Sequence, residues 1–104
     1  MDNETWILDA GVRIASKKAA QGWASLSPTD RLTYCLWVAD YGIRNAGDLA
    51  AAFDLRPTFL DDGRTAAVEL GIPLNIAVFS LSVEEFEHRY FEFFDSLVAE
   101  IQAA

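Results

Sequence analysis

The chain has 104 residues, of which 52% are hydrophobic, and this combination predicts one folded domain over residues 1–104, not a disordered segment. Its net charge of −8 argues against direct binding to nucleic acid or to anionic membrane surfaces, because both attract basic patches. A basic protein is the kind of partner that this charge permits.

The remaining composition predicts a protein of the reducing cytoplasm. No apolar run approaches the roughly 18 residues that span a membrane, and the N-terminal MDNETW has neither the basic nor the apolar region of a secretory signal. The single cysteine, Cys35, cannot form an internal disulfide and is expected in the core. Twelve acids and four arginines lie in residues 32–104, which accounts for the whole net charge.

Start and stop signals typical of helices predict an all-α bundle of five or six helices with no sheet. The first helix is expected over about residues 3–20. Ser27, Pro28 and Asp30 then form a helix start, since a serine cap, a proline at the first position and an acid in the first turn are each favourable. The second helix is expected to run to about Ile43.

The break after the second helix is expected at the sequence NAG. Asn45 is predicted to take a left-handed conformation that ends this helix, and Asp48 to cap a third helix over residues 49–54. Arg56-Pro57 is the next predicted break, because the residue before a proline disfavours helix.

Thr58 is predicted to cap a fourth helix that ends at Leu70. A turn at residues 61–63 is the alternative, and it would delay the start of this helix. The stretch LNIAVFSLS that follows is compatible with a strand or with short helical turns. Helical turns are favoured, because a lone strand would have no partner.

The last helix is predicted over residues 83–102, after the capping box formed by Ser82 and Glu85. One of its faces is a wide apolar stripe that we expect in the core. Glu87 projects into that stripe and needs a polar partner, whereas Phe91 lies at the edge of the opposite, charged face.

An acidic surface is predicted from the charged face of the last helix together with two acids of the fourth. Its expected members are Asp61, Asp62, Glu84, Glu85, His88, Glu92 and Asp95. Glu84 and Glu92 lie four residues before and after His88, so the three side chains are within reach of one another. We expect a solvated face here and predict no metal site, since zinc sites generally use cysteines or several histidines.

The stretch WVADYGIRNAGDL places polar residues in an otherwise apolar helix, which suggests two interpretations. In the structural one, Asp40 and Arg44 pair with each other, and Glu87 is a further candidate member. In the functional one, a strip lines a cleft for a ligand or for a side chain of a partner. That strip consists of Trp37, Asp40, Tyr41, Arg44, Asn45 and Asp48.

The same stretch carries a resemblance to a known family. The turn N-A-G at residues 45–47 and the acidic, aromatic segment FEHRYFEFFDSL are similar to features of a family of small acidic helical bacterial proteins that includes DNA-mimic proteins. The resemblance covers the order of elements over residues 30–98. It implies an acidic surface that imitates phosphates, and it implies no active site.

The predicted function is a non-enzymatic interaction or regulatory module that binds a basic protein as a DNA mimic, an antitoxin-like inhibitor or an immunity-like inhibitor. No phosphate-binding loop, dinucleotide fingerprint, C-x-x-C pair or complete EF-hand loop occurs, so we predict no catalytic residues and no cofactor. The alternative is a ligand-binding protein or enzyme that uses the strip of Asp40, Arg44 and Asn45. Exposed aromatics such as Trp23 leave both a monomer and a homodimer open.

Overall fold

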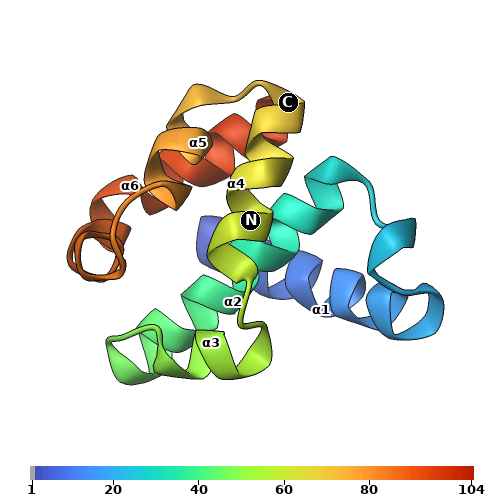
Figure 1. The fold of residues 1–104 in the computed structure, drawn as a ribbon, viewed down its shortest axis with the longest axis horizontal. Coiled ribbons are helices and arrows are strands. Elements are labelled where there is room, and N and C mark those ends of the chain that lie inside the picture. Colours follow the sequence, from blue (N-terminus) through green and yellow to red (C-terminus); the bar gives the residue numbers. More distant parts are fainter. Residues whose placement is uncertain (1) are drawn as a thin grey trace.

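Six α-helices and one short 3-10 turn make up residues 2–104, the part of the chain that the computed structural model describes. In chain order they are α1 (Asn3–Gln21), η1 (Trp23–Ser25), α2 (Pro28–Ala46), α3 (Ala50–Leu55), α4 (Phe59–Leu70), α5 (Pro73–Phe79) and α6 (Val83–Ala103) (Figure 1). No strand occurs within residues 2–104, so the all-α prediction is confirmed. Met1, the first residue of the segment MDNETW in which no secretory signal is predicted, lies outside the described residues.

Short polar side chains begin three of the helices. Oδ1 of Asp2 accepts a hydrogen bond from the backbone N–H of Thr5 at 2.7 Å and so caps α1. The caps predicted at Ser27 and Ser82 are confirmed, because each hydroxyl oxygen accepts from the third residue of its helix, at 3.1 and 3.2 Å. Each cap satisfies a backbone donor and is worth about 1 kcal/mol to its helix.

Glycines in the left-handed region end α2 and α4. Gly47 has a φ of 76° and Gly71 a φ of 68°, and the N–H of Gly47 donates to the carbonyl of Ile43 at 2.9 Å. The prediction that Asn45 turns left-handed is wrong, since every positive φ within residues 2–104 belongs to a glycine. Asn45 stays helical and donates from Nδ2 to the carbonyl of Tyr41 at 2.7 Å. Glycine takes the left-handed conformation without a Cβ clash, so the helix continues until it reaches one.

The start of α4 differs from the prediction. The Thr58 hydroxyl donates to Oδ2 of Asp62 at 2.6 Å instead of accepting from a backbone N–H, so it does not cap the helix. The same oxygen accepts from Nε of Arg56 at 2.7 Å. Residues 61–63 are helical, so the alternative of a turn there is wrong. The predicted break at Arg56-Pro57 is confirmed, and its arginine is tied to the first turn of α4.

The two shortest helices, α3 and α5, both begin at carboxylates supplied by α6. Glu87 accepts from the N–H of Leu49 at 2.8 Å, just before α3. Glu100 accepts from the N–H groups of Leu74 and Asn75 at 2.9 and 2.7 Å, in the first turn of α5. The stretch that was compatible with a strand or with helical turns is therefore helical, and its first turn is held by a residue 25 positions further along the chain.

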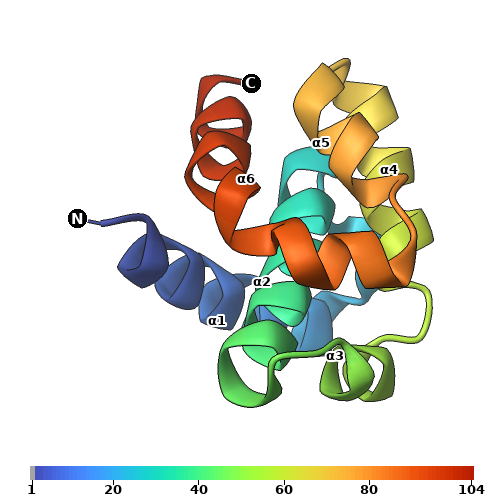
Figure 2. The same ribbon diagram turned by 90° about the vertical axis from the view of Figure 1, so that its left-hand side faces the viewer.

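Helix α2 lies at the centre of the bundle, where it packs against α1, α3, α4 and α6 (Figures 1 and 2). Two ion pairs orient α1 antiparallel to it. Nζ of Lys17 lies 3.4 Å from Asp30 near the start of α2, and Arg44 lies 3.8 Å from Glu4 near its end. The central position explains why α2 is apolar on two sides.

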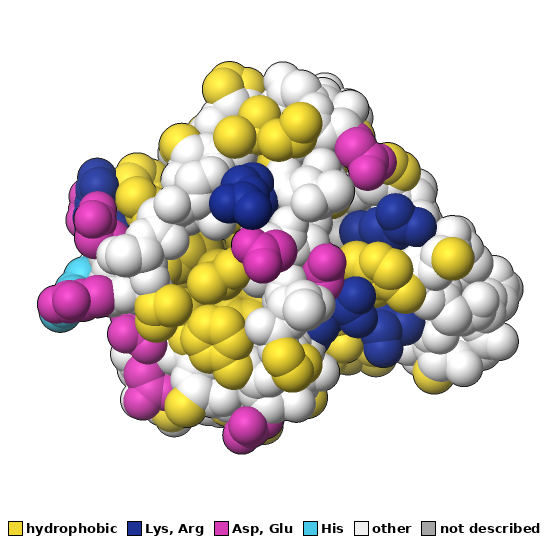
Figure 3. All heavy atoms as spheres, in the orientation of Figure 1, with side chains coloured by type: hydrophobic (Ala, Val, Ile, Leu, Met, Phe, Trp, Pro, Cys, Tyr) yellow, Lys and Arg dark blue, Asp and Glu magenta, His cyan; other side chains and the backbone are white. Residues whose placement is uncertain are grey.

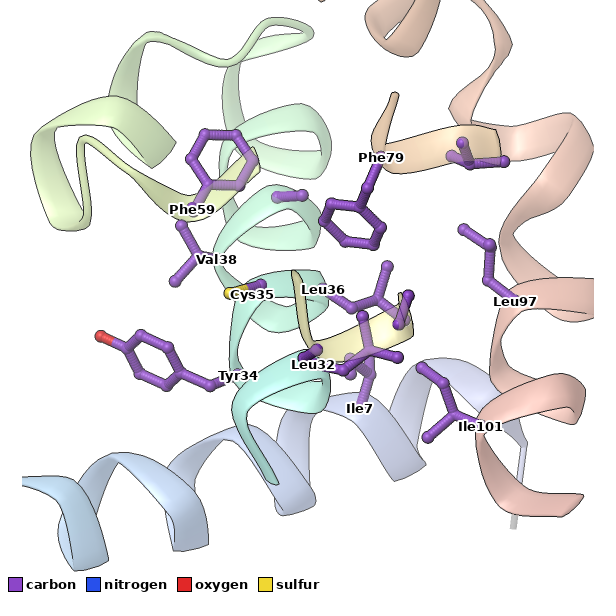
Figure 4. Close-up of a cluster of buried hydrophobic side chains, with 14 of the residues drawn as sticks. Ile7, Leu32, Tyr34, Cys35, Leu36, Val38, Phe59, Phe79, Leu97 and Ile101 are labelled. Atoms are coloured by element: carbon purple, nitrogen blue, oxygen red, sulfur yellow. The ribbon is translucent and has the colours of Figure 1, made fainter. Parts of the chain in front are cut away.

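Side chains from several helices meet in one contiguous core beside α2. Gly11 allows α1 to approach α2 closely, because a Cβ at this position would lie 2.1 Å from the ring of Trp37. Cys35 is fully buried, as predicted. The labelled core members that converge on one another in Figure 4 include Ile7, Leu32, Leu36, Phe79, Leu97 and Ile101.

Candidate functional site

The polar strip of α2 is built around a buried carboxylate. Asp40 is 1% exposed, and Nε of Arg44, one turn later, lies 2.9 and 3.1 Å from its two oxygens. Tyr90 of α6 donates its hydroxyl to Oδ1 of Asp40 at 2.6 Å. The predicted pairing of Asp40 with Arg44 is confirmed. Its burial makes it a stronger contact than an ion pair on a solvated helix face.

Arg44 joins three helices at one point. Its side chain is 26% exposed, and Cζ lies 4.8 Å from the ring centre of Phe94 and 5.1 Å from that of Phe91. Nη1 lies 3.8 Å from a carboxylate oxygen of Glu4 on α1. A guanidinium over an aromatic face gains roughly 0.5–1 kcal/mol even where water competes. The charge of Arg44 is thus held by Asp40 below and by aromatic rings and a carboxylate around it.

The hydroxyl of Tyr90 stays protonated in this environment. Burial raises the pKa of Tyr90 well above its usual value, and the neighbouring Asp40 carboxylate raises it further. Tyr90 therefore acts as a neutral donor, and both oxygens of Asp40 already have donors. This arrangement fixes α2 to α6 through a carboxylate that accepts hydrogen bonds at both of its oxygens.

The other members of the predicted strip make separate local contacts. Trp37 is half-buried against Gly11, whereas Tyr41 is exposed. Asn45 bonds to the backbone one turn earlier, and Asp48 accepts from the N–H of the first residue of α3 at 3.0 Å. No pocket is found in residues 2–104. The six residues are divided between interior contacts and helix-end contacts, so they do not converge on a common ligand position.

Glu87 does not join the pair of Asp40 and Arg44, which was the candidate partner suggested by the sequence. Its Oε2 accepts from the N–H of Leu49, and it forms no hydrogen bond with Asp40 or Arg44 among the contacts of residues 2–104. Asp48 and Glu87 satisfy two backbone donors at the start of α3, the N–H groups of Ala50 and Leu49. The prediction that Asp48 occupies the cap position is wrong, because Leu49 occupies it and α3 begins at Ala50, one residue later than predicted. Glu87, the carboxylate that projects into the apolar stripe, therefore has a backbone partner at Leu49.

The outward face of α6 carries a row of exposed charges. Its members are Glu84, Glu85, His88, Glu92 and Asp95, and we call them the α6 acidic face. Figure 3 shows acidic side chains and the single histidine along the edge where Figure 1 places the start of α6. Arg89 reaches Glu92 at 3.6 Å, and Nδ2 of Asn3 donates to Asp95 at 2.9 Å. Phe91, 59% exposed, lies beside this row.

Asp61 and Asp62 do not belong to the α6 acidic face. They lie on α4, which packs on α2 and α5, and Figure 1 shows the start of α4 apart from the start of α6 at the left edge. Asp61 pairs with Arg64 at 3.2 Å and Asp62 with Arg56 at 2.7 Å. The predicted surface therefore divides into a row on α6 and two neutralised carboxylates on α4.

His88 is the single histidine of the chain, and Cys35 is its single cysteine. Within residues 2–104, no group of three or more histidine, cysteine or acidic side chains is arranged to hold a metal ion. Burial raises the pKa of the Cys35 thiol, so it remains protonated and poorly nucleophilic. In the same part of the chain, no helix is both long and apolar enough to cross a membrane.

Sequence reasoning missed Tyr90 and Glu4 as partners of the polar strip. Tyr90 falls on the apolar stripe of α6, where an aromatic residue is expected for packing alone. Glu4 lies on α1, whose apolar pattern is loose, so the side of α1 that faces α2 was not predictable. The sequence did contain a signal for the contact between Tyr90 and Asp40. A buried aspartate requires more than one hydrogen-bond donor, and a tyrosine hydroxyl on a core-facing stripe requires an acceptor.

The chain was compared with family models, with curated proteins and with solved structures, and none of the three comparisons gives a match.

Proposed function

We propose that the protein is a non-enzymatic interaction module that binds a basic protein through the α6 acidic face. The observation that carries the proposal is the row of exposed carboxylates at Glu84, Glu85, Glu92 and Asp95, which has one arginine, Arg89, within ion-pair distance. A helix face that only needs to be soluble has no requirement for charges of one sign, and mixed signs serve solubility equally well.

The charge density of this face suits a partner that normally binds a polyanion. The four carboxylates from Glu84 to Asp95 span about 17 Å of helix axis, a mean spacing of about 5.5 Å. One strand of B-DNA carries about one charge per 3.4 Å. The DNA-mimic activity implied by the family resemblance is therefore the specific form of this proposal, with carboxylates in the place of phosphates.

Phe91 gives the same face an apolar contact point. Its ring is 59% exposed beside the acidic row, and Arg44 holds the other side of it. Interfaces of high affinity commonly combine a central aromatic residue with a charged rim. In this arrangement the carboxylates steer a basic partner towards the face, and Phe91 adds the area that it buries on contact.

The test compares three immobilised baits in a bacterial lysate at about 50 mM salt, where exposed charges interact over more than 10 Å. They are the wild type, an α6 variant and a control variant with three acids neutralised on α3 and α4. The α6 variant is E84Q/E92Q/D95N, and the control is D54N/D61N/E69Q. Both variants change the net charge from −8 to −5, so only the position of the charges differs.

We expect basic proteins to be retained by the wild type and by the control, to elute in a salt step, and to be lost from the α6 variant. Quantitative mass spectrometry measures the retention. If duplex DNA also displaces these proteins, the DNA-mimic form is supported. Equal retention by all three baits would refute the proposal, because a general effect of net charge does not depend on which helix carries it.

A further inference from the structure

A second charged feature lies away from α6, where the end of α1 and the start of α2 meet η1. Nζ of Lys18 is 5.5 Å from the ring centre of Tyr34, and Cζ of Arg56 and of Arg31 are 3.5 and 5.6 Å from that of Trp23. We call these five residues the basic aromatic patch. Figure 3 shows basic side chains gathered around apolar atoms on the side where Figure 1 places η1.

The patch is positive in a protein that is acidic overall. Arg56 is neutralised by Asp62 at 2.7 Å, whereas Lys18 and Arg31 form no ion pair with any of residues 2–104. Two positive charges therefore lack a compensating carboxylate. A surface that served only solubility in a chain of net charge −8 would not need to gather its bases over two aromatic rings.

The arginines of the patch are held in position. Nε and Nη2 of Arg31 donate to the carbonyls of Trp23 and Ala24 at 3.4 and 3.3 Å, and Nε of Arg56 donates to Asp62. Each guanidinium has five N–H groups, so donors remain on both after these bonds are formed. Charges that are already fixed lose less side-chain entropy when an anion arrives.

The hydroxyl of Tyr34 is an unused donor at the same place. Tyr34 is 6% exposed as a whole residue, its hydroxyl forms no hydrogen bond within residues 2–104, and Figure 4 shows this hydroxyl directed away from the core cluster. Burial raises the pKa of Tyr34, although Arg56 acts to lower it, so the hydroxyl keeps its proton at neutral pH. The oxygen is not among the buried polar atoms that lack a partner, so it reaches solvent and is open to an incoming acceptor.

We propose that the basic aromatic patch binds an extended acidic peptide segment, with one carboxylate at Lys18 and Tyr34 and a second at Arg31 and Arg56. The ring centres of Trp23 and Tyr34 are 5.9 Å apart. Side chains on one face of an extended peptide repeat about every 7 Å, so acids two residues apart match this spacing. The site lies on different elements from the α6 acidic face and is independent of it.

Two other anionic occupants fit the patch less well. A small anion gains most from a site that encloses it, and the patch is a surface. A nucleic acid presents a long row of phosphates, which the remaining acids of the chain repel. A short acidic peptide carries few charges and contacts only the positive region, so it meets the least repulsion.

The test measures fluorescence anisotropy with a labelled Glu-Ala-Glu-Ala-Glu peptide, and a Gln-Ala-Gln-Ala-Gln peptide is the neutral control. Two variants of the patch are compared with the wild type. Lys18→Gln removes a half-buried cation, and Tyr34→Phe removes only the hydroxyl. Arg89→Gln on α6 is the control, because it also removes one cation but at a site outside the patch. Thermal melting establishes that each variant is folded.

We expect the wild type to bind the glutamate peptide in preference to the glutamine peptide, and each patch variant to weaken binding about threefold to tenfold. Arg89→Gln should bind like the wild type. The proposal is overturned if the two peptides bind equally, or if all three variants weaken binding to the same extent. It is also overturned if inorganic phosphate or a single-stranded oligonucleotide displaces the peptide more effectively than chloride of equal ionic strength.

Discussion

Replacement of Asp40 by alanine should destabilise the fold more than any exposed acid could. The change removes the acceptor of both Arg44 and Tyr90. Breaking a buried ion pair costs about 3–5 kcal/mol when the remaining charge is fully buried. Arg44 is 26% exposed and has Glu4 nearby, so its share should be about 2 kcal/mol. A buried hydroxyl without an acceptor adds about 1–3 kcal/mol.

These two contributions sum to about 3–5 kcal/mol, a large part of the roughly 5–15 kcal/mol that stabilises a typical domain. Urea unfolding followed by circular dichroism measures the difference, and the melting temperature should fall by about 15–25 °C. Asp54→Ala, which removes an exposed acid of α3, should change stability by less than about 0.5 kcal/mol. A cost below about 1 kcal/mol for Asp40→Ala would refute the argument, because that is the behaviour of a solvated pair.

A double-mutant cycle with Tyr90→Phe separates the two contributions. In the wild-type background, this change removes one hydrogen bond to a carboxylate, and we expect a cost of about 1.5–3 kcal/mol. In the Asp40→Ala background the hydroxyl has no acceptor, so its removal should cost nothing or increase stability. Equal costs in the two backgrounds would mean that Tyr90 and Asp40 act independently.

Two further predictions concern close packing and pH. Gly11→Ala should lower the free energy of unfolding by about 1–3 kcal/mol despite the higher helix propensity of alanine, because the new Cβ would meet the Trp37 ring at 2.1 Å; an unchanged urea midpoint would show that this ring moves aside freely. Burial acts to raise the pKa of Glu100, but hydrogen bonds from Asn75 and Leu74 outweigh it and lower this pKa below 4.5. The ionised group therefore stabilises the fold above its ordinary pKa and loses this effect as the pH falls through the lowered one, so the stability difference between the wild type and Glu100→Gln should shrink from about pH 6 to about pH 3. A difference that does not change with pH would contradict this assignment.

Features set by neighbours in the chain were predictable from the sequence. The caps at Ser27 and Ser82 depend on a serine and a backbone N–H three residues later, so the local pattern determines them. The pair of Asp40 and Arg44 follows from a spacing of one helical turn. The burial of both sides of α2 follows from its composition, because a helix with apolar residues on two sides is expected to pack at the centre of its domain.

Features set by distant residues were not predictable in the same way. Tyr90 and Asp40 are 50 positions apart, and Glu87 and Leu49 are 38 apart, so no periodicity connects them. The error at Asn45 has a different origin. Asparagine and glycine both favour helix ends, and the glycine two residues later ended the helix at a lower conformational cost. The acidic surface divided for a related reason, since helix faces do not reveal how helices pack.

The carboxylates that α6 supplies to α3 and α5 have a consequence for the order in which the protein folds. Helices of six and seven residues are too short to persist alone in water, because nucleation is unfavourable. Both need an acceptor that lies 25 or more positions later in the chain, so a long loop must close before either gains its full stability. The α1–α2 hairpin can form early from local contacts, whereas α3, α5 and α6 should acquire structure together in one late, cooperative step.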